Sequence, residues 1–512
     1  MRRIRYLTLT IGCCLLLLMA EGQKHDYVWL MGYNSHLGDT LGFHFGNTIF
    51  DFNSSTMEMR RDSLRMNFDF TNTSYCDSSG NLLFYTNGIY VANSLDETIE
   101  NGDSLNAGWL QYKWDTTIRK YGYRDAQGVL AFQDGRNNSY FLLHSFVDSN
   151  VNKAPFGARL LLTYLDMDEN VGHGKVINKN QTILKDSIGT ALSATKHGNG
   201  RDWWILVQKQ LSNCYYRILI DSSGPHVLPD LTCGAATVPL FDAAAACFSP
   251  DGSKYVYLNV KGGISLFDFD RCSGTLSNAK YMPLRVLVDS GWYGVGVAFS
   301  PNNRFLYASV SVHLYQFDLS APNVFASIDT VGVWDGYAAP FGSIFKQPQI
   351  APDGKIYINC GNTETVYHVI NNPDAKGDSC NFAQHSIALP TFAGNSIPNF
   401  PNYRLGRKVG SECDTLWNDL TPDPSPKERV IKVFPSPATD VVTIDYGFTD
   451  WSKQGDVAME IINELGQSVL QQQLPKYSGF QRLNVTSYPS GIYITYIKRN
   501  NQIIATSKFA KQ

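Results

Sequence analysis

Short apolar runs separated by turns recur along most of the chain. In three places an apolar run is followed by a Pro-Asp-Gly or Pro-Asn-Asn turn and then by a second apolar run; the prolines of these turns are Pro250, Pro301 and Pro352. Both intervals between them are 51 residues long. Proline presets φ and glycine accepts positive φ, so such a turn between two apolar runs predicts a β-hairpin. A third apolar run ending in a polar turn follows each hairpin.

Weaker copies of this unit begin near Tyr75, Val129 and Ala191, which brings the number of units to six. A β-rich repeat of about 50 residues is typical of the blades of a β-propeller. A β-sandwich with coincidental turns is the alternative, and the two equal spacings argue against it.

The two ends of this region predict a seventh blade. Three strand-like runs near the N-terminus lack a preceding first strand, and they span residues 27–31, 48–52 and 64–70. Residues 401–405 look like a first strand without followers. A closed propeller avoids an open strand edge. We therefore expect a seven-bladed β-propeller over residues 27–408, closed by pairing of a strand near Tyr403 with the strand near Trp29.

A change in composition follows the repeats. Residues 409–428 include Thr421-Pro422-Asp423-Pro424-Ser425-Pro426, and alternating proline favours an extended linker. Residues 429–512 carry several short strand-like runs, which predict a small Ig-like β-sandwich. The predicted fold class is all-β.

The N-terminus has the pattern of a signal peptide. Arginines at positions 2, 3 and 5 precede an apolar run from Leu7 to Ala20, and small residues lie before a plausible cleavage point between Gly22 and Gln23. We expect residues 1–22 to be removed on export. Acylation of Cys13, as in a lipoprotein, is the alternative. The sequence shows no second apolar stretch of about 18 residues, so no transmembrane anchor is expected.

The C-terminal region resembles the sorting domain of proteins exported by type IX secretion in Bacteroidota-type bacteria. The likeness is carried by Val433-Phe434-Pro435-Ser436-Pro437-Ala438-Thr439-Asp440, Asn463-Glu464-Leu465-Gly466-Gln467, Pro489-Ser490-Gly491-Ile492-Tyr493 and Lys508-Phe509-Ala510-Lys511. The motif residues are Pro435, Pro437, Gly466, Gly491, Tyr493 and Lys508. Ser436 stands where the family usually has Asn.

The repeat region is similar to secreted propeller proteins of the same bacteria, through residues 80–88 and 399–406. Together the two resemblances imply passage through the periplasm to the outer cell surface or the medium. They imply that the type IX machinery reads residues 429–512 and that a protease commonly removes them. They imply no activity for the propeller.

Composition narrows the choice of partner. The chain has 512 residues, with 43 Lys and Arg against 46 Asp and Glu, so it lacks the basic excess that would attract nucleic acid. Charged residues are 17% and aromatic residues 13% of the chain. These values exclude a disordered chain and a coiled coil, and the aromatic content favours strands.

The cysteine content predicts at least one disulfide. Ten cysteines are present, and eight follow the signal peptide into an oxidising compartment. The nearest loop-flanking pairs are Cys214 with Cys233 and Cys380 with Cys413, although spacing alone cannot select the pairing. In the alternative interpretation Cys76, Cys247 and Cys360 are buried thiols in apolar strands.

We find no sequence signature of a catalytic, metal or cofactor site. The G-x-S-x-G, P-loop, H-E-x-x-H and G-x-G-x-x-G motifs are absent, and so is zinc-type spacing of Cys and His. Residues 166–170 look like half a calcium loop but lack its Gly and its bidentate Glu, which favours an acidic turn.

Two functional classes remain. The first is a secreted or surface-exposed binding protein without enzymatic activity, whose partner is an extracellular protein or glycan. The second is a propeller hydrolase or lyase that acts on an extracellular polysaccharide or peptide. Such an enzyme would gather its catalytic groups from several blades, so that no local motif would reveal them.

Overall fold

The fold is taken from a computed structural model of the chain. The structure describes residues 23–40, 42–108, 110, 122–134, 138–149, 155–189, 191–221, 224–236, 244–284, 294–361, 363–395, 397–414, 431–434, 436–447, 457–474, 478–499 and 502–512. The predicted signal peptide and most of the predicted linker lie outside these residues. Contacts divide the chain into two compact units, Met1–Thr415 and Leu416–Gln512.

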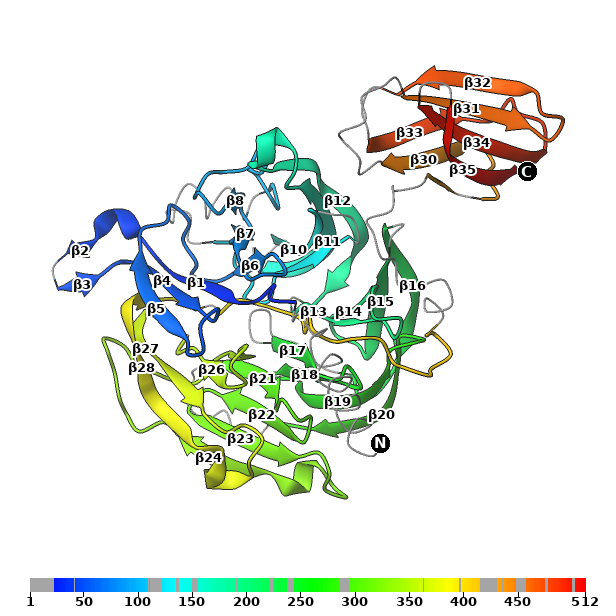
Figure 1. Ribbon diagram of the computed structural model, residues 1–512. Coiled ribbons are helices and arrows are strands. Elements are labelled where there is room, and N and C mark those ends of the chain that lie inside the picture. Colours follow the sequence, from blue (N-terminus) through cyan, green and yellow to red (C-terminus); the bar gives the residue numbers. More distant parts are fainter. Residues whose placement is uncertain are drawn as a thin grey trace, which may run out of the picture. The chain divides into compact units, whose positions relative to one another are not determined.

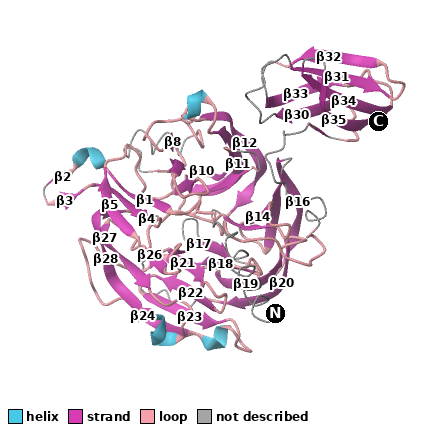
Figure 2. Ribbon diagram, in the orientation of Figure 1, coloured by secondary structure: helices cyan, strands magenta, loops and turns pink. Residues whose placement is uncertain are grey.

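The first unit is built of antiparallel strands and short 3-10 turns (Figure 2). Its described residues form seven sheets of three or four strands and one small ribbon. The first sheet consists of β1 (Val28–Tyr33), β4 (Gly46–Asp51) and β5 (Glu58–Asp62), and the ribbon of β2 (Asp39–Thr40) and β3 (Phe43–His44). The second sheet consists of β6 (Thr73–Cys76), β7 (Leu82–Thr86) and β8 (Val91–Asn93).

The other five sheets have four strands each. They consist of β9 (Val129–Gln133), β10 (Ser139–Ser149), β11 (Pro155–Asp166) and β12 (Lys175–Ile188); β13 (Ser193–Lys196), β14 (Trp203–Gln208), β15 (Cys214–Asp221) and β16 (Gly224–Thr232); β17 (Ala244–Phe248), β18 (Lys254–Asn259), β19 (Gly263–Asp270) and β20 (Thr275–Met282); β21 (Val295–Phe299), β22 (Phe305–Val310), β23 (His313–Asp318) and β24 (Asp329–Val333); β25 (Pro348–Ile350), β26 (Ile356–Ile358), β27 (Glu364–Ile370) and β28 (Phe382–Ala393). The 3-10 turns are η1 (Ser35–Leu37), η2 (Asn170–Gly172), η3 (Phe325–Ser327) and η4 (Gly377–Cys380).

These sheets surround a common centre, so the first unit is a β-propeller (Figure 1). The seven sheets are compatible with the seven blades predicted from the repeat. The repeated turns connect β17 to β18, β21 to β22 and β25 to β26 in equivalent registers, with Tyr257, Tyr307 and Tyr357 each opposite a residue of the first strand. Gly252 and Gly354 have φ of +70° and +79°, which explains the glycine in two of these turns.

The core lies between neighbouring sheets. Along β21, Val297 packs with residues of β18 and β19 on one side, whereas Ala298 packs with Phe345 and Ile356 on the other. Successive side chains of a strand point to opposite faces, so each inner strand joins two interfaces. The inner strands are therefore almost continuously buried, and their apolar runs read as a repeat in the sequence.

The expected closing strand is not formed. Residues 401–405 have no strand pairing in the structure, and β1 pairs along one edge with β4 while its other edge forms a single bridge, from Gly32 to Phe68. That bridge is the only β-bridge within residues 64–70, where a strand was expected. The strand that forms instead, β5, ends at Asp62, before this range. Pro398 and Pro401 explain the missing strand, because proline cannot donate a hydrogen bond to a ladder.

The second unit is a sandwich of two small sheets. One sheet has the order β29 (Lys432–Phe434), β30 (Val441–Gly447), β33 (Ser478–Asn484), and the other has the order β32 (Ser468–Gln473), β31 (Val457–Asn463), β34 (Gly491–Arg499), β35 (Gln502–Lys511). Val442 and Ile444 of the first sheet share a buried cluster with Met459 and Ile497 of the second. The unit therefore has its own core.

Among the helices of the described residues, none has the length and apolar character needed to cross a bilayer.

Candidate functional site

Residues 397–405 run through the centre of the propeller, and Asn399 fixes their position. Its side-chain amide donates to the carbonyls of Val129 and Leu192, at 3.2 Å each. Its backbone N–H donates to the carbonyl of Asn72, and its own carbonyl accepts from the hydroxyl of Thr73 at 3.2 Å. One asparagine thus binds the inner segments of three sheets.

A second amide closes the channel at the same level. Gln127 donates from Nε2 to the carbonyl of Ala246 at 3.0 Å and accepts from the backbone N–H of Ala246 at 2.9 Å. The space left beside Gln127 and Asn399 is about 10 Å³. The described residues around Gln127 and Asn399 thus leave room for about one water molecule, which is too little for a ligand to pass between them.

The N-terminal segment holds the rest of the central segment in place. Arg404 forms a two-point ion pair with Asp26, with N–O distances of 2.5 and 2.8 Å. The rings of Trp29 and Phe400 lie 6.0 Å apart. These side-chain contacts bring the two ends of the propeller chain together in place of the expected strand pairing.

A cavity of about 260 Å³ lies beyond this closed level. Pro250, Pro301 and Pro352 of the three repeated turns contribute to its lining, together with the rings of Phe248 and Phe400. The turns meet there because each follows the inner strand of its sheet. The sequence repeat therefore has a geometric counterpart at one mouth of the central channel.

The polar groups of the cavity are few. Asp26 and Arg404 are the charged side chains of its lining, and they neutralise each other. Asn402 donates to the carbonyl of Pro250 at 2.7 Å, and Gln349 is half-buried beside it in the lining. Burial raises the pKa of the Cys247 thiol, which therefore stays protonated at neutral pH. The described residues of the lining thus offer hydrogen bonds, and none of them is poised for proton transfer or nucleophilic attack.

A Cys–His contact elsewhere has the wrong protonation for catalysis. Cys360 Sγ lies 3.3 Å from Nε2 of His368, whose Nδ1 accepts from the backbone N–H of His385. The single ring proton of neutral His368 is therefore assigned to Nε2, which cannot accept a proton from the thiol. Burial lowers the pKa of His368 to about 3 and raises that of Cys360. This pair is a buried structural contact.

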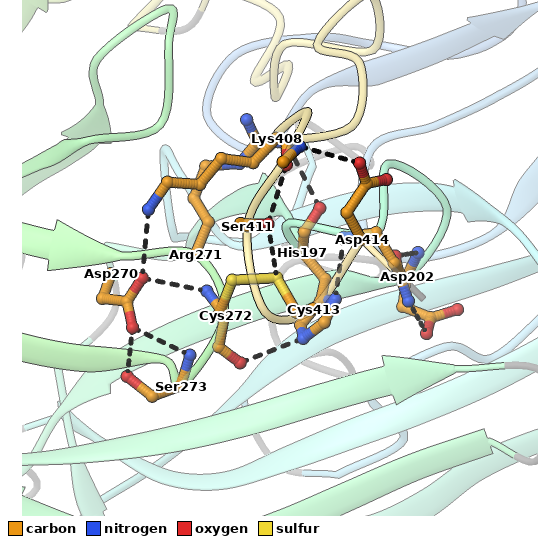
Figure 3. The surroundings of a disulfide bond; sticks show 12 residues. His197, Asp202, Asp270, Arg271, Cys272, Ser273, Lys408, Ser411, Cys413 and Asp414 are labelled. Atoms are coloured by element: carbon orange, nitrogen blue, oxygen red, sulfur yellow. Dashed lines mark hydrogen bonds and ion pairs between the residues drawn. A yellow bond between two sulfur atoms is a disulfide. The ribbon is translucent and has the colours of Figure 1, made fainter. Parts of the chain in front are cut away.

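A disulfide fixes the segment of chain that leaves the centre of the propeller. Cys413 bonds to Cys272, which follows β19 and is 141 residues away in sequence. Figure 3 shows this disulfide with Arg271 and Lys408 beside it. Lys408 donates from its backbone N–H to the carbonyl of Gly198, and Arg271 donates to the carbonyl of Gly406. We call residues 406–414 the strap. The strap holds the end of the propeller chain against the sheets of β13 and β17.

The disulfide confirms that at least one pair forms, but neither expected pairing does. The Cys214 thiol donates to Asp230 at 3.0 Å, whereas Cys233 packs with Tyr215 on the opposite face of that sheet. Cys380 is buried between the sixth and seventh sheets, away from Cys413. Cys76 and Cys360 are buried free thiols, as the alternative interpretation predicts, and Cys247 is a free thiol at the cavity.

The predicted sorting residues are spread over the sandwich. Tyr493 is buried, stacks on Phe509 at 5.3 Å and donates to the carbonyl of Pro489. Gly466 has φ of +75° in the turn between β31 and β32, Gly491 begins β34, and Lys508 is exposed on β35. The hydroxyl of Ser436, which precedes Pro437, accepts from the backbone of Ala510. Pro435 and Gly22 lie outside the described residues. The recognition role of these residues stays a prediction.

The remaining predicted residue, Gln23, accepts a hydrogen bond from Lys196 at 2.9 Å. Sequence reasoning missed the cavity and the central segment, although Pro398-Asn399-Phe400-Pro401 carried a signal. Two prolines around an asparagine suit an irregular segment better than a strand. Among the described residues, no group of three His, Cys, Asp or Glu side chains is placed to hold a metal ion.

Comparison with known proteins identifies the second unit. Residues 432–512 match the family described as "Secretion system C-terminal sorting domain". This confirms the type IX sorting domain predicted from the sequence, and with it export to the cell surface or the medium. No curated protein gives a significant match to the chain.

Solved structures with similarity to the chain are propeller proteins of low sequence identity. A candidate 6-phosphogluconolactonase from Bacteroides uniformis has a TM-score of 0.41 and 14% identity, covering 71% of this chain and 97% of its own. The Dos1 propeller has a TM-score of 0.35 and 14% identity, covering 63% and 85%. The Cps50 (Swd1) propeller domain of Myceliophteria thermophila has a TM-score of 0.30 and 12% identity, covering 76% and 96%. Values this low carry no argument about activity.

Proposed function

We propose that this exported β-propeller is a binding protein without enzymatic activity, and that it holds its ligand in the cavity at the mouth of its closed channel. The sorting domain at 432–512 delivers it to the cell surface or the medium. The ligand is then a component of the extracellular surroundings.

This proposal rests on the charged side chains of the cavity lining, which form an ion pair with each other and leave the cavity without net charge. A hydrolase or lyase needs a group that gives or takes a proton in reach of the substrate. Here the carboxylate of Asp26 is engaged by two donors of Arg404, whose guanidinium cannot act as a base, and the Cys247 thiol stays protonated. The apolar walls and amide groups are those of a binding pocket.

A binding screen with a blocked cavity tests the proposal. The mature full-length protein is screened against glycan and peptide arrays, alongside Gln349→Trp, which places an indole in the cavity. Gln181→Trp, on the exposed face of β12, is the matched control. We expect a ligand that binds the wild type and Gln181→Trp equally and Gln349→Trp at least about tenfold more weakly, a loss of about 1.4 kcal/mol.

Two results would contradict the proposal. Equal binding of the ligand by Gln349→Trp and the wild type would place the site elsewhere. Cleavage of a bound glycan or peptide, detected by mass spectrometry of the incubated ligand and abolished in Gln349→Trp, would instead establish the hydrolase or lyase.

A further inference from the structure

We infer that the cavity takes one uncharged sugar ring, such as a terminal or internal unit of a neutral extracellular glycan. This inference rests on the binding function proposed above and adds the chemical class of the ligand. It follows from the charge, the hydrogen-bonding groups, the walls and the size of the cavity.

The charge of the site disfavours ionic ligands. Arg404 is already paired with Asp26, whose side chain is 3% exposed, so an anion would meet a neutralised guanidinium. Asp251 and Asp353, next to two of the lining prolines, are exposed and do not line the cavity, so solvent and salt screen their charges. A cationic group would in turn have to displace Arg404 from Asp26, and breaking a buried ion pair leaves an uncompensated charge. An uncharged ligand meets neither penalty.

The polar groups of the cavity suit hydroxyls. The Gln349 side chain offers a carbonyl oxygen and an amide, and it makes one long bond of 3.3 Å, to the carbonyl of Ile350. Arg404 uses two of its five N–H groups on Asp26, which leaves further donors on the same guanidinium. A sugar hydroxyl both donates and accepts, so it can bridge an amide oxygen and a guanidinium donor.

The walls suit the C–H faces of a sugar ring. Three proline rings and the rings of Phe248 and Phe400 give apolar surfaces between which a pyranose can lie. Aromatic faces carry negative charge and attract polarised C–H groups. Proline side chains lose little conformational freedom on binding, so the walls are preorganised.

The size limits the ligand to about one ring. The cavity of about 260 Å³ is below the roughly 300–1,000 Å³ of pockets that enclose drug-sized molecules. The closed level at Gln127 and Asn399 prevents a chain from threading further. A glycan therefore presents one unit to the cavity and leaves its remainder outside.

Matched sugars separate this inference from its alternatives. Saturation-transfer NMR with the mature full-length protein is run on neutral pentoses and hexoses, and then on the trio of glucose, glucuronate and glucosamine, which share one ring and differ in charge. We expect saturation of at least one neutral sugar. We also expect an affinity for glucose, or for the best neutral sugar, at least about tenfold above that of its acidic and amino analogues. Gln349→Trp should lose the signal, and Gln181→Trp should keep it.

The outcomes distinguish failure of the sugar assignment from failure of the proposed binding function. No saturation of any neutral sugar, or equal binding of the charged analogues, overturns the sugar assignment. If a peptide or a charged glycan binds instead and Gln349→Trp abolishes its binding, the sugar assignment fails and the binding function stands. If Gln349→Trp leaves every interaction unchanged, the cavity is not the site and both fail.

Discussion

Burial of a single carboxyl group makes Glu364 sensitive to pH. Glu364 is 1% exposed, and it accepts a hydrogen bond from the backbone N–H of Ala339 at 3.3 Å. Burial raises its pKa from 4.5 to about 7, because the carboxylate loses hydration that this contact replaces only in part. Between these two values the folded state binds more protons than the unfolded state. The free energy of unfolding therefore falls as pH rises through this range.

Glu364→Gln removes the charge and keeps the hydrogen-bonding shape. We expect the variant to match the wild type at about pH 4, below the unfolded-state pKa, and to exceed it by roughly 1–3 kcal/mol at about pH 8, where the wild-type carboxylate is ionised. Urea denaturation at the two pH values measures the difference. Parallel loss of stability in both proteins between the two pH values would show that another group is responsible.

At the level of elements, an irregular segment takes the place of a closing strand. Asn399 supplies hydrogen bonds to inner segments of three sheets, and Asp26 and Arg404 join the chain ends. The strap then fixes the outgoing chain through Cys272 and Cys413. A disulfide that closes so long a loop restricts the unfolded chain, an effect of roughly 2–5 kcal/mol. The central segment therefore holds the surrounding sheets of the propeller together through these contacts.

Asn399→Ala tests the role of this segment. Removal of the amide leaves the buried carbonyls of Val129 and Leu192 without their donor, so we expect a loss of about 2–4 kcal/mol in the free energy of unfolding. Asn178→Ala, an exposed position on β12, should change stability by less than about 0.5 kcal/mol. Urea denaturation of both variants provides the comparison. Equal stability of the two variants would show that the Asn399 side chain does not hold the sheets together.

At the scale of the whole molecule, the proposed binding cavity and the sorting domain belong to separate units. Each unit has its own buried core, and the match to a sorting domain is confined to residues 432–512. The cavity is lined by residues of the first unit alone. Binding and export should therefore respond to different substitutions.

Truncation before Arg429 should separate the two functions. Without residues 429–512 the type IX machinery has no sorting domain to read, so we expect the propeller to accumulate in the periplasm. Cell fractionation and immunoblotting locate the protein, and resistance to limited proteolysis reports whether it is folded. Normal amounts of truncated protein at the surface or in the medium would show that the sorting signal lies elsewhere.

Local patterns in the sequence were enough to predict the hairpins and the sorting domain. Apolar runs around the turns at Pro250, Pro301 and Pro352 specify hairpins, because the turn residues and the flanking strands depend on neighbours a few positions away. The sorting motif is likewise a set of short segments in fixed order. The fold class and export were therefore predictable, and both are confirmed.

The closure of the propeller, the pairing of the disulfide and the cavity depend on the three-dimensional fold. Each joins residues that lie far apart in the chain: Asp26 with Arg404, Cys272 with Cys413, and the three repeated turns with one another. A strand-like run at 401–405 satisfied the local pattern, but the prolines of that segment and the hydrogen bonds of Asn399 favour an irregular path through the centre. The partners of these residues are set by which segments meet once the sheets surround the centre, and local sequence patterns do not identify those partners.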